Sequence, residues 1–94
     1  MFVITLSYIV PLEQVEPWLA EHIQFLDAQY EAGIFIASGR RVPRTGGVIL
    51  ARNCDRDTIE KIMELDPFKR EQLAEFTIIE FTPSKMTAGF EQFI

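Results

Sequence analysis

The stretch IFIASGRRVPRTGGVILAR, residues 34–52, contains two apolar runs joined by a polar connection. Ile34 to Ser38 is typical of one strand, and Gly47 to Arg52 is typical of the next. The residues between them, 39–46, are rich in Gly and Arg and indicate a solvated hairpin connection. We therefore expect two consecutive strands in the middle of the chain.

The segment before this hairpin changes from strand to helix at Pro11. Phe2 to Val10 is rich in β-branched and aromatic residues and predicts a first strand. From residue 12 to 32 the apolar residues recur at helical spacing, and Gly33 stands where a helix C-terminal glycine would. The recurring residues are Leu19, Ile23, Leu26 and Tyr30. Pro17 interrupts the early part, so either a short first turn precedes it or the main helix starts there with Pro17 in its first turn.

The segment after the hairpin predicts a second helix and a last strand. Asp55 or Asp57 caps this helix, and the Asp66-Pro67-Phe68 step ends it before a further turn. The residues expected to face inward are Ile59, Ile62, Met63 and Leu65. Ala74 to Thr82 forms strand four, and residues 83–94 form a C-terminal tail. The order β-α-β-β-α-β predicts an α+β, ferredoxin-like fold with a four-stranded antiparallel sheet and both helices on one face.

Both faces of the predicted sheet carry apolar side chains. In the first strand one face carries Phe2, Ile4, Leu6 and Tyr8, and the other carries Val3 and Ile9. In strand four, Phe76 and Ile78 likewise oppose Ile79 and Phe81. A sheet that is wet on one side would alternate apolar and polar residues, so the second face needs a cover. We favour a homodimer of the dimeric α/β-barrel type, packed through this sheet face, although the aromatic tail could instead fold back over the chain's own sheet.

Length and composition set limits on the fold and on the partners. The 94 residues suffice for one domain, residues 1–94, and a chain this small gains from extra burial by self-association. The net charge of −5, without a basic stripe, argues against nucleic-acid binding. No apolar run approaches the roughly 20 residues that span a bilayer, and the N-terminus resembles a first strand more than a signal peptide. The lone Cys54 is typical of an ordinary turn residue in a reducing, cytoplasmic setting.

His22, the only histidine, lies on the apolar side of the first helix, three residues after Leu19 and four before Leu26. It is either a packed imidazole with a hydrogen-bond partner or a catalytic or binding residue. We expect no metal, because no second His and no Cys pair accompanies it. Asp66 precedes Pro67 and is typical of a cap, a role compatible with orienting an imidazole. Spacing alone does not show that His22 and Asp66 touch.

Arg40, Arg41 and Arg44 form the only dense positive cluster in this acidic chain. They are either charges that keep an edge strand soluble or a patch that attracts a carboxylate- or phenolate-bearing ligand. We assign Arg41 and Arg44 to the first account. Arg40 stays open, because it follows Ser38-Gly39 at a strand end where a binding cleft could form.

The ordered combination of these residues resembles a known family. His22 lies in the first helix, Gly33 follows it, Ser38-Gly39 closes the second strand, Gly47 lies in the third, and Asp66-Pro67-Phe68 follows the second helix. This order resembles the YciI (YCII-related) family over nearly the whole chain apart from the tail.

The resemblance implies a dimer of ferredoxin-like subunits, sheet against sheet, with a cleft where His22 and Asp66 meet as a catalytic dyad. Some relatives are linked to acid/base chemistry on small aromatic compounds, including elimination of chloride from a hydroxylated ring. Family members often have Pro where this chain has Arg40, and the change favours a more anionic ligand.

The function expected from the residues and the resemblance is acid/base catalysis on a small aromatic or carboxylated metabolite, of the lyase, isomerase or hydrolase type, without a cofactor. Tyr8, Ser38, Gly39 and Arg40 are the expected ligand-binding residues, Tyr8 and Ser38 on strand-face grounds. Three alternatives stay open. The first is a non-catalytic ligand-binding or accessory domain, and the second is a structural domain in which His22 and Asp66 serve only packing and capping. The third, on fold analogy alone, is a haem- or quinol-handling monooxygenase of the dimeric α/β-barrel shape.

Overall fold

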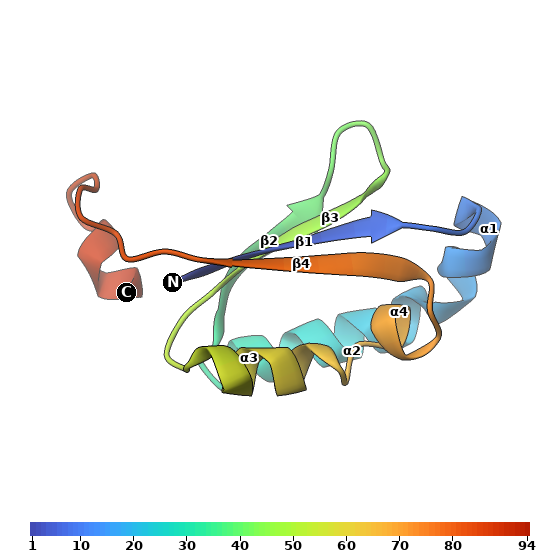
Figure 1. The fold of residues 1–94 in the computed structure, drawn as a ribbon, viewed down its shortest axis with the longest axis horizontal. Coiled ribbons are helices and arrows are strands. Elements are labelled where there is room, and N and C mark those ends of the chain that lie inside the picture. The colour runs from blue at the N-terminus through green and yellow to red at the C-terminus, as the bar shows by residue number, and fades with distance from the viewer.

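The four strands form one antiparallel sheet in the order β2-β3-β1-β4, and the main helices cover one of its faces (Figure 1). The computed structural model describes all residues, 1–94. In chain order the elements are β1 (Phe2–Tyr8), α1 (Leu12–Val15), the 3₁₀ helix η1 (Glu16–Trp18), α2 (Leu19–Glu31), β2 (Phe35–Arg40), β3 (Gly46–Ala51), α3 (Arg56–Met63), α4 (Pro67–Arg70), β4 (Ala74–Glu80) and the 3₁₀ helix η2 (Phe90–Phe93). The predicted α+β, ferredoxin-like architecture is confirmed.

The core lies between the sheet and helices α2, α3 and α4. Alternate residues of β1 point to the helices, and Phe2, Ile4 and Leu6 are 0–2% exposed. The helical side contributes buried apolar residues, namely Val15, Phe25, Ile59, Met63 and Phe68. Burial of these side chains is the main free energy that holds the helices on the sheet.

The helix ends follow the expected capping chemistry. The Asp55 side chain accepts a hydrogen bond from the Thr58 N–H at 2.8 Å, so Asp55 and not Asp57 caps α3. Asp66 caps α4, with Pro67 as its first residue. Gly33 follows α2 with a φ of +78°, a backbone conformation that favours glycine.

The first helical region begins with a short turn, which settles the two alternatives at Pro17. Helix α1 comes first, Pro17 lies in η1, and α2 starts at Leu19. The expectation that Leu65 faces inward was wrong. Helix α3 ends at Met63, so the helical spacing does not continue to Leu65, which is 62% exposed.

Strand β2 is longer than predicted and contains an irregularity that changes which face its residues occupy. It continues to Arg40 rather than ending at Ser38. Phe35 pairs with Ala51, but the register then shifts by one, so that Ser38 pairs with Ile49. A β-bulge of this kind re-aims side chains. Phe35 therefore joins the core, and Ser38 and Arg40 also face the helix-covered side.

The opposite face of the sheet has no helix over it (Figure 1). Val3 and Leu50 on this face are half-buried, while Ile79 is 53% and Phe81 42% exposed. The tail runs beyond the end of the sheet, near the N-terminus, and does not cover this face. None of the helices has the length and apolar character needed to cross a membrane.

Candidate active site

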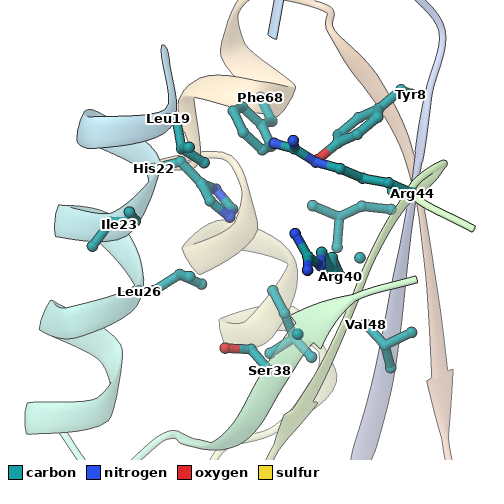
Figure 2. A pocket seen from close by; sticks show the side chains of 15 residues that line it. Tyr8, Leu19, His22, Ile23, Leu26, Ser38, Arg40, Arg44, Val48 and Phe68 are labelled. Atoms are coloured by element: carbon teal, nitrogen blue, oxygen red, sulfur yellow. The ribbon is translucent and has the colours of Figure 1, made fainter. Parts of the chain in front are cut away.

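A pocket of about 490 Å³ opens between α2 and the helix-covered face of the sheet (Figure 2). Its apolar walls come from both layers and include Leu6, Leu19, Ile23, Leu26, Ile49 and Phe68. The apolar stripe of α2 explains this position. Ile23 is 47% exposed and lines the pocket, while Phe25 is the buried core residue of this helix. Three of the apolar residues that recur at helical spacing, Leu19, Ile23 and Leu26, therefore form a wall of the pocket.

His22 and Asp66 meet at one side of this pocket. His22 comes from α2, Asp66 from the start of α4, and His22 Nδ1 lies 2.9 Å from Asp66 Oδ1. The His22 ring also stacks on Phe68, with centroids 4.0 Å apart and planes tilted by 6°. The hydrogen bond and the stack together fix the plane of the imidazole. Because Nδ1 is turned to Asp66, Nε2 is the ring nitrogen available to a ligand in the pocket.

Asp66 is completely buried, and its two carboxylate oxygens differ in their partners. Oδ1 accepts the Phe68 N–H at 2.9 Å in addition to its contact with His22. Oδ2 is buried without a hydrogen-bond partner. An ionised carboxylate only accepts hydrogen bonds, so with Asp66 ionised Nδ1 of His22 is the donor in this contact. A cap requires only one oxygen, so the second buried oxygen is not explained by capping.

The polar residues of the pocket come from the sheet. Tyr8, Ser38 and Arg40 line it, as does Gly39 with its backbone. Tyr8, Ser38 and Arg40 all lie on the helix-covered face of the sheet. Ser38 Oγ also lies 2.7 Å from the hydroxyl of Tyr30. The structure therefore brings together all six residues that the sequence singled out, five as pocket lining and Asp66 directly behind His22.

Sequence reasoning missed Arg44. It was assigned to a solvated connection, but it lines the pocket and points inward from the β2–β3 hairpin (Figure 2). Arg41, given the same assignment, does stay outside the pocket, where its Nη1 donates to Ser7 Oγ at 2.8 Å. The signal in the sequence was the same for both residues, because position in a hairpin loop does not show which way a long side chain turns.

An ion pair on the surface joins the two helices that carry His22 and Asp66. Arg70 of α4 lies 2.7 Å from Glu21, the residue before His22, and packs over the Trp18 ring. The hydrogen bond from Arg70 lowers the pKa of the Glu21 carboxyl below its ordinary value. The Glu21–Arg70 pair links the same two parts of the fold as the His22–Asp66 contact, but its side chains are exposed.

The remaining reactive groups do not form a second site. Cys54 lies outside the pocket, and burial raises the pKa of its thiol, which disfavours the reactive thiolate. No three His, Cys, Asp or Glu side chains lie close enough together to hold a metal ion.

Comparison with known proteins places this arrangement in a family. The family model of the YCII-related domain matches residues 1–82. Among solved structures, 5-chloro-2-hydroxyhydroquinone dehydrochlorinase from Burkholderia phenoliruptrix, in complex with 2,5-dihydroxybenzoquinone, is similar with a TM-score of 0.72 and 16% sequence identity. The match covers 87% of this chain and 94% of that chain, and at this identity it shows the shared fold alone. No curated protein matches the sequence. By the family match, the chain belongs to the YCII-related domain family.

Proposed function

We propose that this protein is an enzyme that performs acid/base chemistry on a small aromatic or carboxylated molecule, with His22 as the catalytic residue and Asp66 as its positioning partner. The observation that carries the proposal is the 2.9 Å contact between His22 and a fully buried carboxylate at the side of a ligand-sized pocket. Small-molecule sites have volumes of about 300–1,000 Å³, and this pocket lies within that range.

The proposed chemistry follows from the tautomer. Asp66 holds the proton on Nδ1, so the lone pair of Nε2 faces the ligand. Nε2 takes a proton from the ligand, and the buried carboxylate stabilises the imidazolium that forms. The same proton is then returned to the ligand or to a leaving group that departs with its electron pair. General acid/base catalysis of this kind contributes about 10²–10⁴-fold in rate.

The pocket walls support a flat, partly apolar ligand. Leucine and phenylalanine side chains cover a ring, while Tyr8, Ser38 and Arg40 offer polar contacts at the sheet side. The similar solved structure is a dehydrochlorinase bound to an oxygenated six-membered ring, which is a precedent for such chemistry on this fold.

The test compares His22→Ala with Gln24→Ala, an exposed residue on the same helix. Both variants and the wild type are assayed against chlorinated and unsubstituted hydroxyhydroquinones and hydroxybenzoates. We expect His22→Ala to lose about 10²-fold or more in turnover while Gln24→Ala is unchanged. Equal turnover by His22→Ala would refute the catalytic role. Binding without turnover by the wild type would favour the non-catalytic alternative.

We further propose that a second copy of the chain covers the open face of the sheet. Ile79 and Phe81 are the main exposed residues of an apolar surface on this face. Two copies related by a two-fold axis can pack these surfaces against each other. Size-exclusion chromatography with light scattering should give a dimer for the wild type and a monomer for Ile79→Lys. Leu65→Lys, at an apolar position on the helical side that is 62% exposed against 53% for Ile79, should stay dimeric. A monomeric wild type would refute this assembly.

A further inference from the structure

The six arginines of the chain differ in whether the protein itself supplies partners for their guanidinium groups. Four have partners: Arg41 bonds Ser7, Arg52 bonds the carbonyls of Gly33 and Gln92, Arg56 pairs with Glu60, and Arg70 pairs with Glu21 and Glu71. Arg40 and Arg44 have neither a side-chain hydrogen bond nor an ion pair. The two unpaired arginines are also the two that line the pocket.

The pocket around these two arginines contains no acidic side chain. No Asp or Glu is among the residues that line the pocket. Both arginines are exposed residues on the same pocket, so their like charges repel each other, and an anion bound beside both would offset that repulsion. The chain has a net charge of −5, but the two unpaired arginines make the electrostatic potential at this pocket positive. Small anions are therefore attracted to the pocket.

The fold aims Arg40 at the pocket by two features. The β-bulge early in β2 returns Arg40 to the helix-covered face, as described for Ser38. Opposite Arg40 on β3 is Gly47, which has no side chain to occupy the space above the strand. Arg44 reaches the same pocket from the hairpin loop, and Figure 2 shows both side chains pointing toward the side where α2 carries His22.

We infer that Arg40 and Arg44 bind the carboxylate of the ligand, so that the pocket takes a small ring carboxylate with its reacting group at His22. This inference rests on the proposed function for the role of His22 and extends it to the substrate class. Guanidinium groups match the planar, two-oxygen geometry of a carboxylate. The apolar side chains that line the pocket cover the ring.

The test measures binding of two ligands of the same shape, 4-hydroxybenzoate and its neutral isostere 4-hydroxybenzamide, in which an NH2 group replaces one carboxylate oxygen. Isothermal titration calorimetry gives the Kd, and the imidazole NMR signal of the single histidine shows whether the ligand occupies the pocket. The variants are Arg40→Gln, Arg44→Gln and their double. Arg41→Gln is the matched control, because it removes the same charge from the same hairpin but lies outside the pocket.

We expect the wild type to prefer the benzoate by about tenfold or more, since hydrogen bonds between charged groups have this strength. Each pocket variant should weaken benzoate binding by about tenfold and leave benzamide binding unchanged, and the double variant should lose the preference. Arg41→Gln should change either Kd by less than about twofold. Absence of a preference in the wild type, its survival in the double variant, or an equal loss in Arg41→Gln would overturn the inference. Phenyl phosphate is titrated alongside, and tighter binding than the benzoate would overturn the assignment to a carboxylate.

The inference and the proposed function fail separately. His22→Phe should retain the preference for the benzoate in calorimetry, because the arginines make that contact. If the arginine variants lose the preference while His22 variants keep full turnover, carboxylate binding stands and the catalytic role falls. If the arginine variants keep the preference while His22→Ala loses turnover, the catalytic role stands and carboxylate binding by the arginines is refuted.

Discussion

The contact between His22 and Asp66 can be tested without a substrate, by a double-mutant cycle on the free energy of unfolding. His22→Phe keeps an aromatic ring that can stack on Phe68 but removes both nitrogens. Asp66→Ser keeps a side-chain oxygen that caps α4 but removes the carboxylate. The double variant removes both halves of the contact, so the cycle isolates what the two residues contribute together.

The expected magnitude follows from burial. Asp66 is 0% exposed and Oδ2 has no partner, so in His22→Phe the carboxylate keeps only the Phe68 N–H. Loss of one hydrogen bond to a buried charged group destabilises by about 1.5–3 kcal/mol. Asp66→Ser leaves one imidazole N–H without its acceptor, at a cost of about 1 kcal/mol. The double variant contains no unpaired buried charge, so its loss should fall short of the sum of the single losses by about 2 kcal/mol.

The assay is urea unfolding at pH 7 followed by circular dichroism. Protein concentration is held constant, because the apparent stability of an associating protein depends on it. In a domain of this size about 1 kcal/mol corresponds to roughly 4–8 °C, so thermal unfolding checks the same ranking. The control cycle uses Glu21→Gln and Arg70→Met, which break an ion pair whose side chains are 45% and 44% exposed. Solvent screens that pair, so its coupling should be small.

A coupling energy below about 0.5 kcal/mol for His22 and Asp66 would refute the reasoning, because that value is within the usual scatter of independent sites. The two residues would then be neighbours without an energetic link. If the coupling energy of the exposed Glu21–Arg70 cycle were as large as that of the His22–Asp66 cycle, burial would not be the source of the His22–Asp66 coupling.

Two further predictions concern the scaffold. A Cβ at Gly46 would lie 1.7 Å from the Leu6 carbonyl oxygen, so Gly46→Ala should lower the free energy of unfolding by about 2 kcal/mol or more. The control is Gly39→Ala, whose new Cβ has nothing within 4 Å and should change this free energy by less than about 0.5 kcal/mol. Thermal unfolding measures both. Hydrogen bonds from Thr58 lower the pKa of Asp55 below its ordinary 3.8, so its contribution to stability is present above that pH and is lost as the pH falls through the lowered value. Asp55→Ala should therefore melt below the wild type at pH 6, and this difference should shrink as the pH falls below about 4; a constant difference would contradict the account.

Much of the fold could be predicted because it depends on local signals. The helices and strands were located from the spacing of apolar residues, the positions of glycine and proline, and the capping residues. The order of these elements then limited the possible topologies. Leu65 shows where local reasoning fails. Its spacing fits a helix face, but the helix ends two residues earlier, and helix ends depend on packing as well as on sequence.

The candidate site could be predicted only in part, because its contacts are not local. The hydrogen bond between His22 and Asp66 joins residues 44 positions apart, and only the resemblance to a family suggested it. The bulge in β2 is also absent from the sequence pattern. Simple alternation from Phe35 would place Ser38 and Arg40 on the opposite face, and one extra residue reverses that assignment.

The pocket and the open face lie on opposite sides of a single sheet, and this has a kinetic consequence for a two-fold assembly. Leu6 and Ile49 line the pocket, whereas Val3 and Leu50, on the neighbouring positions, face outward. In the proposed dimer, the residues of the candidate site would therefore all come from one subunit, because a single chain lines the whole pocket. Hybrid assemblies of one wild-type and one His22→Phe subunit should work at half speed with an unchanged KM, and saturation curves should be hyperbolic rather than sigmoidal.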